Sequence, residues 1–307
     1  MDAAYNDPIF TDETAAREAL ESVRWPNGPV CVHCGATEHV VRVAGEKQSH
    51  RPGLLYCNDC KGQFTVTVGT VFERSKIPLT KWWLATHLLC SSKKGISSHQ
   101  ISRTLGVTYK TAWFMTHRIR EAMAPGENAG PLGGAGKSVE ADETFLSKSP
   151  KTRKTSPLHA KPDRQVLSLV ERGGALRSVY LDGRNVREAL TTKLLHDDSR
   201  LLTDGAQHYK FQLHTHESVD HSKFEWARGD VHTNTLEGFF SIFKRGLTGV
   251  YQHCESQHLH RYLAEFDFRY NNRAKLGIDD TDRTVNAIRG IEGKRLTYRP
   301  ADRETKN

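Results

Sequence analysis

The chain has 307 residues, enough for two or three domains at about 100 to 200 residues each. Its 44 Lys and Arg residues outnumber its 36 Asp and Glu residues, and the formal net charge of +8 favours a polyanionic partner, with nucleic acid the first candidate. No run of about 18 apolar residues and no signal peptide is visible, so we expect a cytoplasmic protein with no membrane partner, in a reducing compartment that disfavours disulfides.

The first predicted element is a short helix within residues 1–26. Thr11 or Asp12 is its candidate N-cap, and Pro26 is its stop. A segment rich in cysteines and turn residues follows at 27–75.

Two Cys-x-x-Cys pairs in this segment predict a zinc ribbon. Two residues between thiolates let one turn direct both sulfurs at a single ion, and two such turns complete a tetrahedron, so the Zn²⁺ is expected to be structural. His33, His39 and His50 are alternative ligands, ordinary buried thiols are the alternative to a metal, and Cys90 and Cys254 are expected to be isolated thiols. The predicted zinc ligands are Cys31, Cys34, Cys57 and Cys60.

Residues 76–125 have helical patterns, and their second half predicts a helix-turn-helix. Ile101 and Leu105 lie four apart, Gly106 begins a short turn, and Thr108 can cap the next helix. A helix-turn-helix places its second helix in the DNA major groove, whereas a helical hairpin that packs only on its neighbours is the alternative. The predicted DNA-facing residues are Tyr109, Lys110 and Thr111, with His117, Arg118 and Arg120 nearer phosphates.

A Gly- and Pro-rich linker at 126–136 is the clearest domain boundary. The α/β domain that follows is expected to span 137–275, with a C-terminal tail at 276–307, so the whole chain is predicted to be an α+β multidomain protein. Strands followed by alternating strands and helices indicate a mixed sheet flanked by helices. The predicted strands are 138–146, 165–171, 176–182 and 200–203, and the predicted helices are 185–196, 233–247 and 256–273.

Three carboxylates in this domain are candidates for one site. Asp142 lies in the first strand, and Asp204 lies at the end of the run that forms the strand at 200–203. Glu237 lies at the margin of an apolar helical stripe, and Lys244, two turns later, is on nearly the same side of that helix. Each has an ordinary alternative: an edge-strand charge for Asp142, a turn residue for Asp204, and a capping-box partner of Asn234 for Glu237.

Metal chemistry supplies a reason for three carboxylates. Mg²⁺ or Mn²⁺ prefers oxygen ligands, and two ions about 3.5 to 4 Å apart can activate an attacking hydroxyl and stabilise the leaving oxygen of a phosphoryl transfer. Glu140 shares the predicted face of Asp142 and is a rival or supporting group, whereas Glu143 is expected to point away.

These residues resemble the bacterial insertion-sequence transposases of the ISXO2-like, IS1595-type group. The resemblance rests on "ADET", on "TDG" after 61 intervening residues, and on "NTLEGFFSIFKRGLTGVY", whose Glu237 follows after a further 32. It implies an N-terminal zinc ribbon and a ribonuclease-H-like domain with a mixed five-stranded sheet that begins at 138–146. It also implies metal-dependent cleavage and joining of DNA at inverted repeats.

By this resemblance Asp142, Asp204 and Glu237 are the metal carboxylates, with Asn234 able to share or take the third position. Lys244 is expected to contact DNA near the cut end, and we include the adjacent Arg245 in the DNA-binding set. A basic segment at 147–164 is expected to touch phosphates, with Lys151, Arg153 and Lys154 as its assigned residues, although a solvated loop is the alternative.

The sequence therefore predicts a DNA transposase that binds double-stranded DNA as a homo-oligomer. A non-enzymatic DNA-binding regulator derived from a transposase, and a metal-dependent nuclease of the same fold, are the alternatives.

Overall fold

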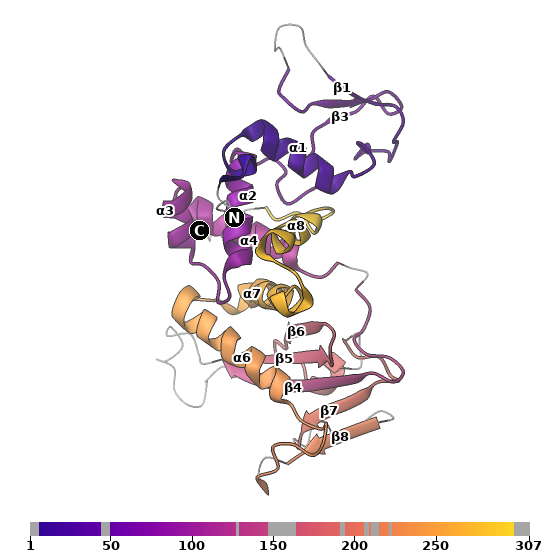
Figure 1. The fold of residues 1–307 in the computed structure, drawn as a ribbon, viewed down its shortest axis with the longest axis vertical. Coiled ribbons are helices and arrows are strands. Elements are labelled where there is room, and N and C mark those ends of the chain that lie inside the picture. The colour runs from indigo at the N-terminus through magenta and orange to yellow at the C-terminus, as the bar shows by residue number, and fades with distance from the viewer. Residues whose placement is uncertain are drawn as a thin grey trace, which may run out of the picture. The chain divides into compact units, whose positions relative to one another are not determined.

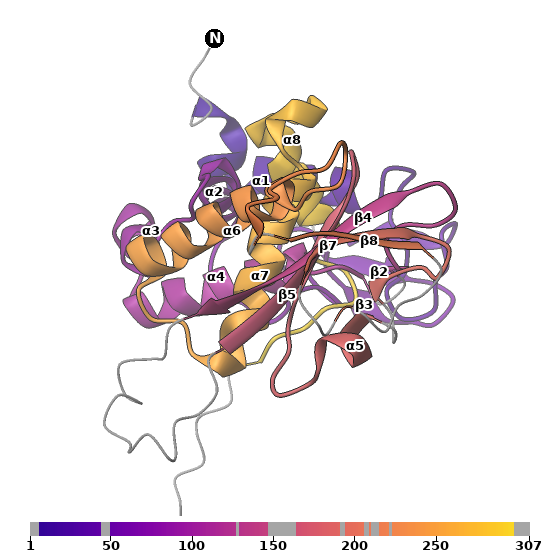
Figure 2. The same cartoon turned by 90° about the horizontal axis from the view of Figure 1, so that it is seen from below.

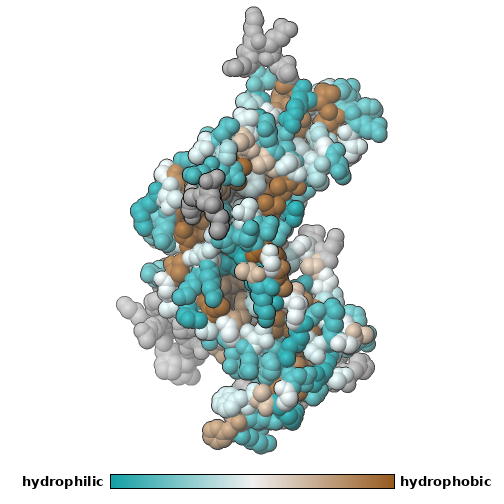
Figure 3. Space-filling model, viewed as in Figure 1, coloured by the Kyte–Doolittle hydropathy of each residue, from teal (hydrophilic) through white to brown (hydrophobic). Residues whose placement is uncertain are grey.

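The structure is a computed structural model (Figure 1) and describes residues 6–43, 50–126, 129–146, 164–190, 194–205, 209, 215–220 and 223–297. Among these residues, no helix is both long enough and apolar enough to cross a membrane. Hydrophilic residues predominate on the face drawn in Figure 3, with hydrophobic residues scattered among them.

The chain divides into two compact units. The first contains residues up to Ser91, Ser97–Met123 and the residues from Asp279 onward, and the second contains Ser92–Ile96 and Ala124–Ile278. The boundary at Ala124 lies close to the start of the predicted linker.

The first unit is mainly helical and carries a small antiparallel sheet in the order β1-β2-β3. The predicted N-terminal helix begins where its cap was expected, because the Thr14 N–H donates to Asp12 Oδ1 at 2.9 Å. The elements of this unit are η2 (Pro8–Phe10), α1 (Glu13–Arg24), β1 (Val40–Arg42), β2 (Leu55–Cys57), β3 (Gln63–Phe64), α2 (Leu79–Ser91), α3 (Ser98–Leu105), α4 (Tyr109–Met123) and α8 (Asp280–Arg289).

Helix α8 corrects the prediction that residues 276–307 form a tail. Its capping box at Asp279 and Asp282 starts the helix, and Ile288 is only 1% exposed. The Arg283 guanidinium donates to the Cys90 carbonyl of α2 at 2.9 Å. The apolar side of α8 is therefore part of the core of the first unit.

The second unit contains a mixed five-stranded sheet in the order β6-β5-β4-β7-β8, as the resemblance implied. Strand β4 pairs antiparallel with β5 and parallel with β7, and β8 is parallel to β7. The elements are β4 (Ser138–Leu146), β5 (Arg164–Glu171), β6 (Leu176–Tyr180), α5 (Val186–Ala189), β7 (Arg200–Asp204), β8 (Thr215–Val219), α6 (Asn234–Gly246), a π-helical turn (Leu247–Tyr251), α7 (Ser256–Asn271) and a 3-10 turn (Ala274–Leu276).

Alternating side chains on the strands build a core on each face of the sheet. On one face, Val166 and Val170 of β5 pack with Leu236 and Phe240 of α6 and with residues of α7. On the other, Leu167 and Leu169 pack with α5. The two helical layers can be followed in Figures 1 and 2. Glu140 and Asp142 of β4 belong to the face that α6 covers.

The structure bears on two further predictions for this unit. The helix predicted at 185–196 begins as α5, and Leu190 and Leu194 are also helical, with residues 191–193 outside the described part of the chain. Strand β8 was not predicted, because its sequence THESV is mostly polar and lacks a clear alternation.

Candidate functional site

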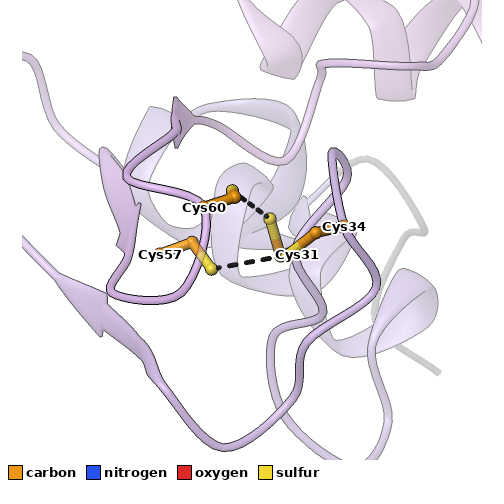
Figure 4. Close-up of side chains that lie close together, drawn as sticks. All are labelled: Cys31, Cys34, Cys57 and Cys60. Atoms are coloured by element: carbon orange, nitrogen blue, oxygen red, sulfur yellow. Dashed lines mark hydrogen bonds between the residues drawn. The ribbon is translucent and has the colours of Figure 1, made fainter.

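The four cysteines of the paired motifs form one compact cluster in the first unit (Figure 4). The Cys31 and Cys60 sulfurs are 3.6 Å apart, and those of Cys34 and Cys57 are 3.7 Å apart. A tetrahedral zinc with Zn–S bonds of about 2.3 Å requires sulfur separations of about 3.8 Å. The cluster therefore has the dimensions of a structural Cys₄ zinc centre.

The thiols of this cluster differ in pKa, and the histidines have other partners. Burial raises the pKa of Cys31, but hydrogen bonds from the backbone N–H groups of Cys34 and His33 and from the side chains of Cys34 and Cys60 bring it to about 6. The pKa values of Cys34 and Cys60 are raised, because hydrogen bonds with neighbouring cysteines and burial favour their neutral form. His33 lies against the Gln63 carbonyl at 3.4 Å, and His39 pairs with an aspartate instead of the sulfurs. A side chain at Gly62 would lie 3.2 Å from the Cys60 sulfur, so the second turn needs glycine for its close approach.

Helices α3 and α4 form a tightly joined pair in the same unit. Gly106 closes α3 in the left-handed conformation with a φ of 60°, and the Thr111 N–H donates to Thr108 Oγ1 at 3.2 Å at the start of α4. Tyr109 is 48% exposed and stacks on His99, and Lys110 beside it is exposed. The first turn of α4 thus presents aromatic and basic groups to solvent.

The later part of α4 differs from the prediction. Arg118 is 9% exposed and donates to the carbonyls of Leu296 and Glu73 at 3.1 and 3.2 Å, and Arg120 is 1% exposed and donates to Thr116 Oγ1. His117 is also buried. These side chains hold α4 inside the first unit, so we remove Arg118 and Arg120 from the candidate phosphate contacts.

The carboxylates of the second unit lie on two adjacent strands and one helix. Strand β4 is the middle strand of five, which excludes the edge-strand explanation of Asp142. In the parallel pairing of β4 with β7, Ser138 lies beside Arg200 and Glu140 beside Leu202. Asp142 and Asp204 each follow the last of these pairs by two residues, and they are close enough for the charge of Asp204 to raise the pKa of Asp142.

The pKa of Asp142 records this convergence. Burial raises it most, and the negative charges of Asp204, Glu143 and Glu237 raise it further, while a hydrogen bond from the Glu143 N–H opposes them; the resulting pKa is about 7. The structure therefore brings Asp142, Asp204 and Glu237 into electrostatic contact.

Glu237 does not act as a helix cap. Thr233 is the N-cap of α6, with no side-chain capping hydrogen bond, and Asn234 is the first helical residue and exposed. Glu237 is exposed one turn later, so the capping-box explanation does not account for it. Asn234 and Glu237 lie three apart on the solvent side of α6.

The oxygen atoms of Asp142, Asp204 and Glu237 lie farther apart than the ligands of a single bound metal ion. Across the ranges that the structure describes, the cysteine cluster is the only group of three or more Cys, His, Asp or Glu residues whose ligand atoms all lie within 4.8 Å of one another.

The neighbours of Asp142 on β4 have separate partners. The Glu140 side chain is 0% exposed and pairs with Arg172 and Thr235. Glu143 accepts a hydrogen bond from the hydroxyl of Tyr209, which packs in the core on the opposite face of the sheet. Glu143 therefore points away from Glu140, as predicted.

Two residues in this region were missed by the sequence reasoning. Tyr209 is fully buried, and its pKa is raised well above its usual value by burial and by the charges of Glu143, Asp142 and Asp204. Arg172 follows β5 and reaches Glu140. Neither belongs to a motif, and we find no sequence signal that could have identified them.

The candidate DNA contacts in the second unit are described only in part. Lys244 and Arg245 are exposed in the last turn of α6, and Lys244, two turns after Glu237, lies on nearly the same side of the helix. Lys151, Arg153 and Lys154 lie outside the described residues.

Comparison with known proteins gives two domain matches and one related protein. Residues 131–271 match the ISXO2-like transposase domain, and residues 11–63 match the transposase zinc-ribbon domain. A protein of Halobacterium salinarum, described as an uncharacterized protein in transposable element ISH50, is 31% identical over 277 residues, which cover 85% of this chain and 91% of the relative.

Proposed function

Because the chain belongs to the IS1595-type transposases, we propose that it cuts and joins DNA at the ends of an insertion sequence. We take the second unit to be a ribonuclease-H-like catalytic domain. In its mixed five-stranded sheet, Asp142 lies on β4 and Asp204 on β7, the first and fourth strands in chain order.

The observation that carries the proposal is the effect of Asp204 and Glu237 on Asp142. Burial raises the pKa of Asp142 most, and the charges of Asp204 on a second strand and of Glu237 on a helix, both far away in sequence, contribute to a pKa of about 7. Such convergence of like charges is costly to a fold without a cation, and perturbed carboxylates of this kind cluster at functional sites.

The donor set fits a hard divalent ion. Asp142, Asp204 and Glu237, with Asn234 as an alternative third donor, offer oxygen ligands suited to Mg²⁺ or Mn²⁺. A pair of such ions, when bound, would activate the attacking hydroxyl and stabilise the leaving oxygen of the phosphodiester. Structural Zn²⁺ belongs to the cysteines.

DNA recognition is assigned to both units. We propose that α3 and α4 act as a helix-turn-helix that presents Tyr109, Lys110 and Thr111 to the terminal repeats. Lys244 and Arg245 would contact phosphates near the cut, together with Lys151, Arg153 and Lys154. Two element ends must be held together during joining, so we propose that the protein forms a homo-oligomer on DNA.

A cleavage and joining assay on the inverted repeats of the element tests this function. Asp142→Asn and Asp204→Asn should each abolish Mg²⁺-dependent nicking and strand transfer while DNA binding persists. Asp197→Asn, the same change at an exposed position, should leave both steps intact. Full activity in the Asp142 and Asp204 variants would refute the mechanism.

The products also separate the two alternatives. Cutting without joining would indicate a nuclease of the same fold. Binding without either reaction in the unmodified protein would indicate a regulator.

A further inference from the structure

Glu140 is a buried charge whose role the proposed chemistry leaves open. It lies two residues before Asp142 on the middle strand of the sheet, with a fully buried side chain. Both of its oxygens are engaged. Oε1 accepts from the Thr235 hydroxyl at 2.7 Å, and Oε2 accepts from the Thr235 backbone N–H at 3.2 Å.

These bonds supply a cap that α6 otherwise lacks. The N-cap residue Thr233 makes no side-chain hydrogen bond to the first turn. The Glu140 carboxylate, from a different element, takes that place and sets a negative charge at the positive end of the helix dipole.

Arg172 completes the arrangement. Its Nε lies 2.6 Å from Glu140 Oε1 as an ion pair, although the N–H is not aligned for a hydrogen bond. Its Nη2 donates to the His232 carbonyl at 3.1 Å, just before α6. The end of β5, the middle of β4 and the start of α6 therefore meet at one buried carboxylate.

The position of this contact matters for the candidate active site. Glu140 precedes Asp142 by two residues, or about 7 Å along a strand, and Thr235 precedes Glu237 by two residues, or about 3 Å along a helix axis. The bonds between Glu140 and Thr235 thus hold the first turn of α6, from which Glu237 projects, against the part of β4 that carries Asp142.

We propose that Glu140 is a positioning residue, which holds the start of α6 against β4 so that Glu237 and Asp142 can bind divalent metal together. The proposal rests on the proposed function and deepens it. Because both oxygens of Glu140 are held by Thr235 and Arg172, Glu140 acts through these neighbours and not as a metal ligand.

Mn²⁺ binding to the full-length protein without DNA tests the proposal, with free Mn²⁺ followed by electron paramagnetic resonance. Glu140→Gln removes the charge, and Thr235→Val removes only the hydroxyl donor. Loss of groups that orient metal ligands commonly weakens affinity 10- to 100-fold. We therefore expect about 10-fold weaker binding in Glu140→Gln, a smaller loss in Thr235→Val, and near-normal binding in Thr235→Ser, which restores the hydroxyl.

Glu265→Gln is the matched control. Glu265 is also a fully buried glutamate of the second unit that pairs with an arginine, Arg269, and accepts from a hydroxyl, that of Tyr251. It lies in α7, away from the first turn of α6. Its variant should lose stability and keep wild-type Mn²⁺ affinity.

The outcomes separate the inference from the function on which it rests. Wild-type Mn²⁺ affinity in both Glu140→Gln and Thr235→Val would overturn the positioning role and leave the transposase proposal standing. Equal weakening in Glu265→Gln would also overturn it, by showing a general effect of lost stability. A wild-type protein that binds no Mn²⁺ would contradict the proposed function itself.

Discussion

Asp142 is only partly ionised near neutral pH in the absence of metal, because burial and three neighbouring carboxylates raise its pKa from its usual value of 3.8 to about 7. A divalent ion reverses this balance, since positive charge favours the ionised form. The same side chain therefore links protonation, metal binding and stability.

The metal-free protein should lose stability as the pH rises from about 4 to about 7. Below about pH 4, Asp142 is protonated in both the folded and the unfolded protein, so it does not affect stability. Between about pH 4 and 7 the unfolded chain releases a proton that the folded protein retains, so the free energy of unfolding falls as the pH rises. Above about pH 7 Asp142 is ionised in both states, and the loss of stability is complete. Asp142→Asn should raise the free energy of unfolding above pH 7 by about 2 kcal/mol, less than the full shift implies because the side chain is partly exposed.

Urea unfolding of both proteins at pH 5 and pH 8 measures this difference. Burial also raises the pKa of Asp267 to about 7, so Asp267 contributes a similar pH dependence. Because Asp267 is present in both proteins, the difference between the wild type and Asp142→Asn isolates the effect of Asp142. If the free energy of unfolding changed equally with pH in the wild type and in Asp142→Asn, Asp142 would not titrate as described.

Two basic residues of α4 should behave in opposite ways. Arg118→Ala should lower the free energy of unfolding by about 2 kcal/mol, because it leaves two carbonyls without their charged donor, and should not change the salt dependence of DNA binding. Lys110→Ala, at an exposed position, should leave stability unchanged within about 0.5 kcal/mol and reduce the slope of log K against log salt by about 1.

Chemical unfolding and a salt titration of DNA affinity distinguish these effects. If Arg118→Ala had normal stability but a smaller slope of log K against log salt, Arg118 would be a DNA contact after all.

At the scale of elements, α8 shows how a C-terminal segment completes the first unit. The carbonyl of Ile291, just after α8, accepts the Val71 N–H at 3.1 Å, and Gly293 donates to the Gly69 carbonyl. Such backbone bonds between distant segments require the helix to be docked.

Ile288→Ala should therefore destabilise the protein by about 2 to 4 kcal/mol through the cavity it leaves in the core. Leu276→Ala, which truncates a side chain that is 48% exposed, should change stability by less than about 0.5 kcal/mol. Thermal or urea unfolding measures both, and a small effect of Ile288→Ala would mean that α8 is not docked in solution.

Elements with a strong local pattern could be predicted from the sequence. The apolar stripe of α6, with Leu236, Phe240 and Phe243 at helical spacing, gave its bounds within one residue, and the strand with Asp142 has the bounds expected. The clustering of the four cysteines could be predicted from the two Cys-x-x-Cys pairs, because tetrahedral metal coordination allows few arrangements of such pairs.

Features that depend on tertiary contacts could not be predicted in the same way. The polar strand β8 is defined by its pairing with β7, and α8 is held by a hydrogen bond from Arg283 to the carbonyl of Cys90, which lies 193 positions earlier. The helix-turn-helix pattern predicts Arg118 and Arg120 near DNA phosphates, whereas hydrogen bonds within the folded unit allow their burial. The Glu140 contact likewise joins residues 95 positions apart.

At the scale of the whole molecule, a chain with a net charge of +8 also contains a locally acidic site. Basic residues can hold the DNA backbone, but the carboxylates repel the phosphate that must react. A divalent ion resolves this conflict, because it neutralises the carboxylates and attracts the phosphate together. The account therefore depends on metal binding by residues 142, 204 and 237.

An anomalous difference map from crystals grown with Mn²⁺ and a DNA end tests this claim most directly. We predict Mn²⁺ bound to oxygens of Asp142 and Asp204, with Glu237 or Asn234 as the third protein donor. Mn²⁺ bound elsewhere, or a DNA complex in which these carboxylates carry no ion at saturating Mn²⁺, would contradict the account.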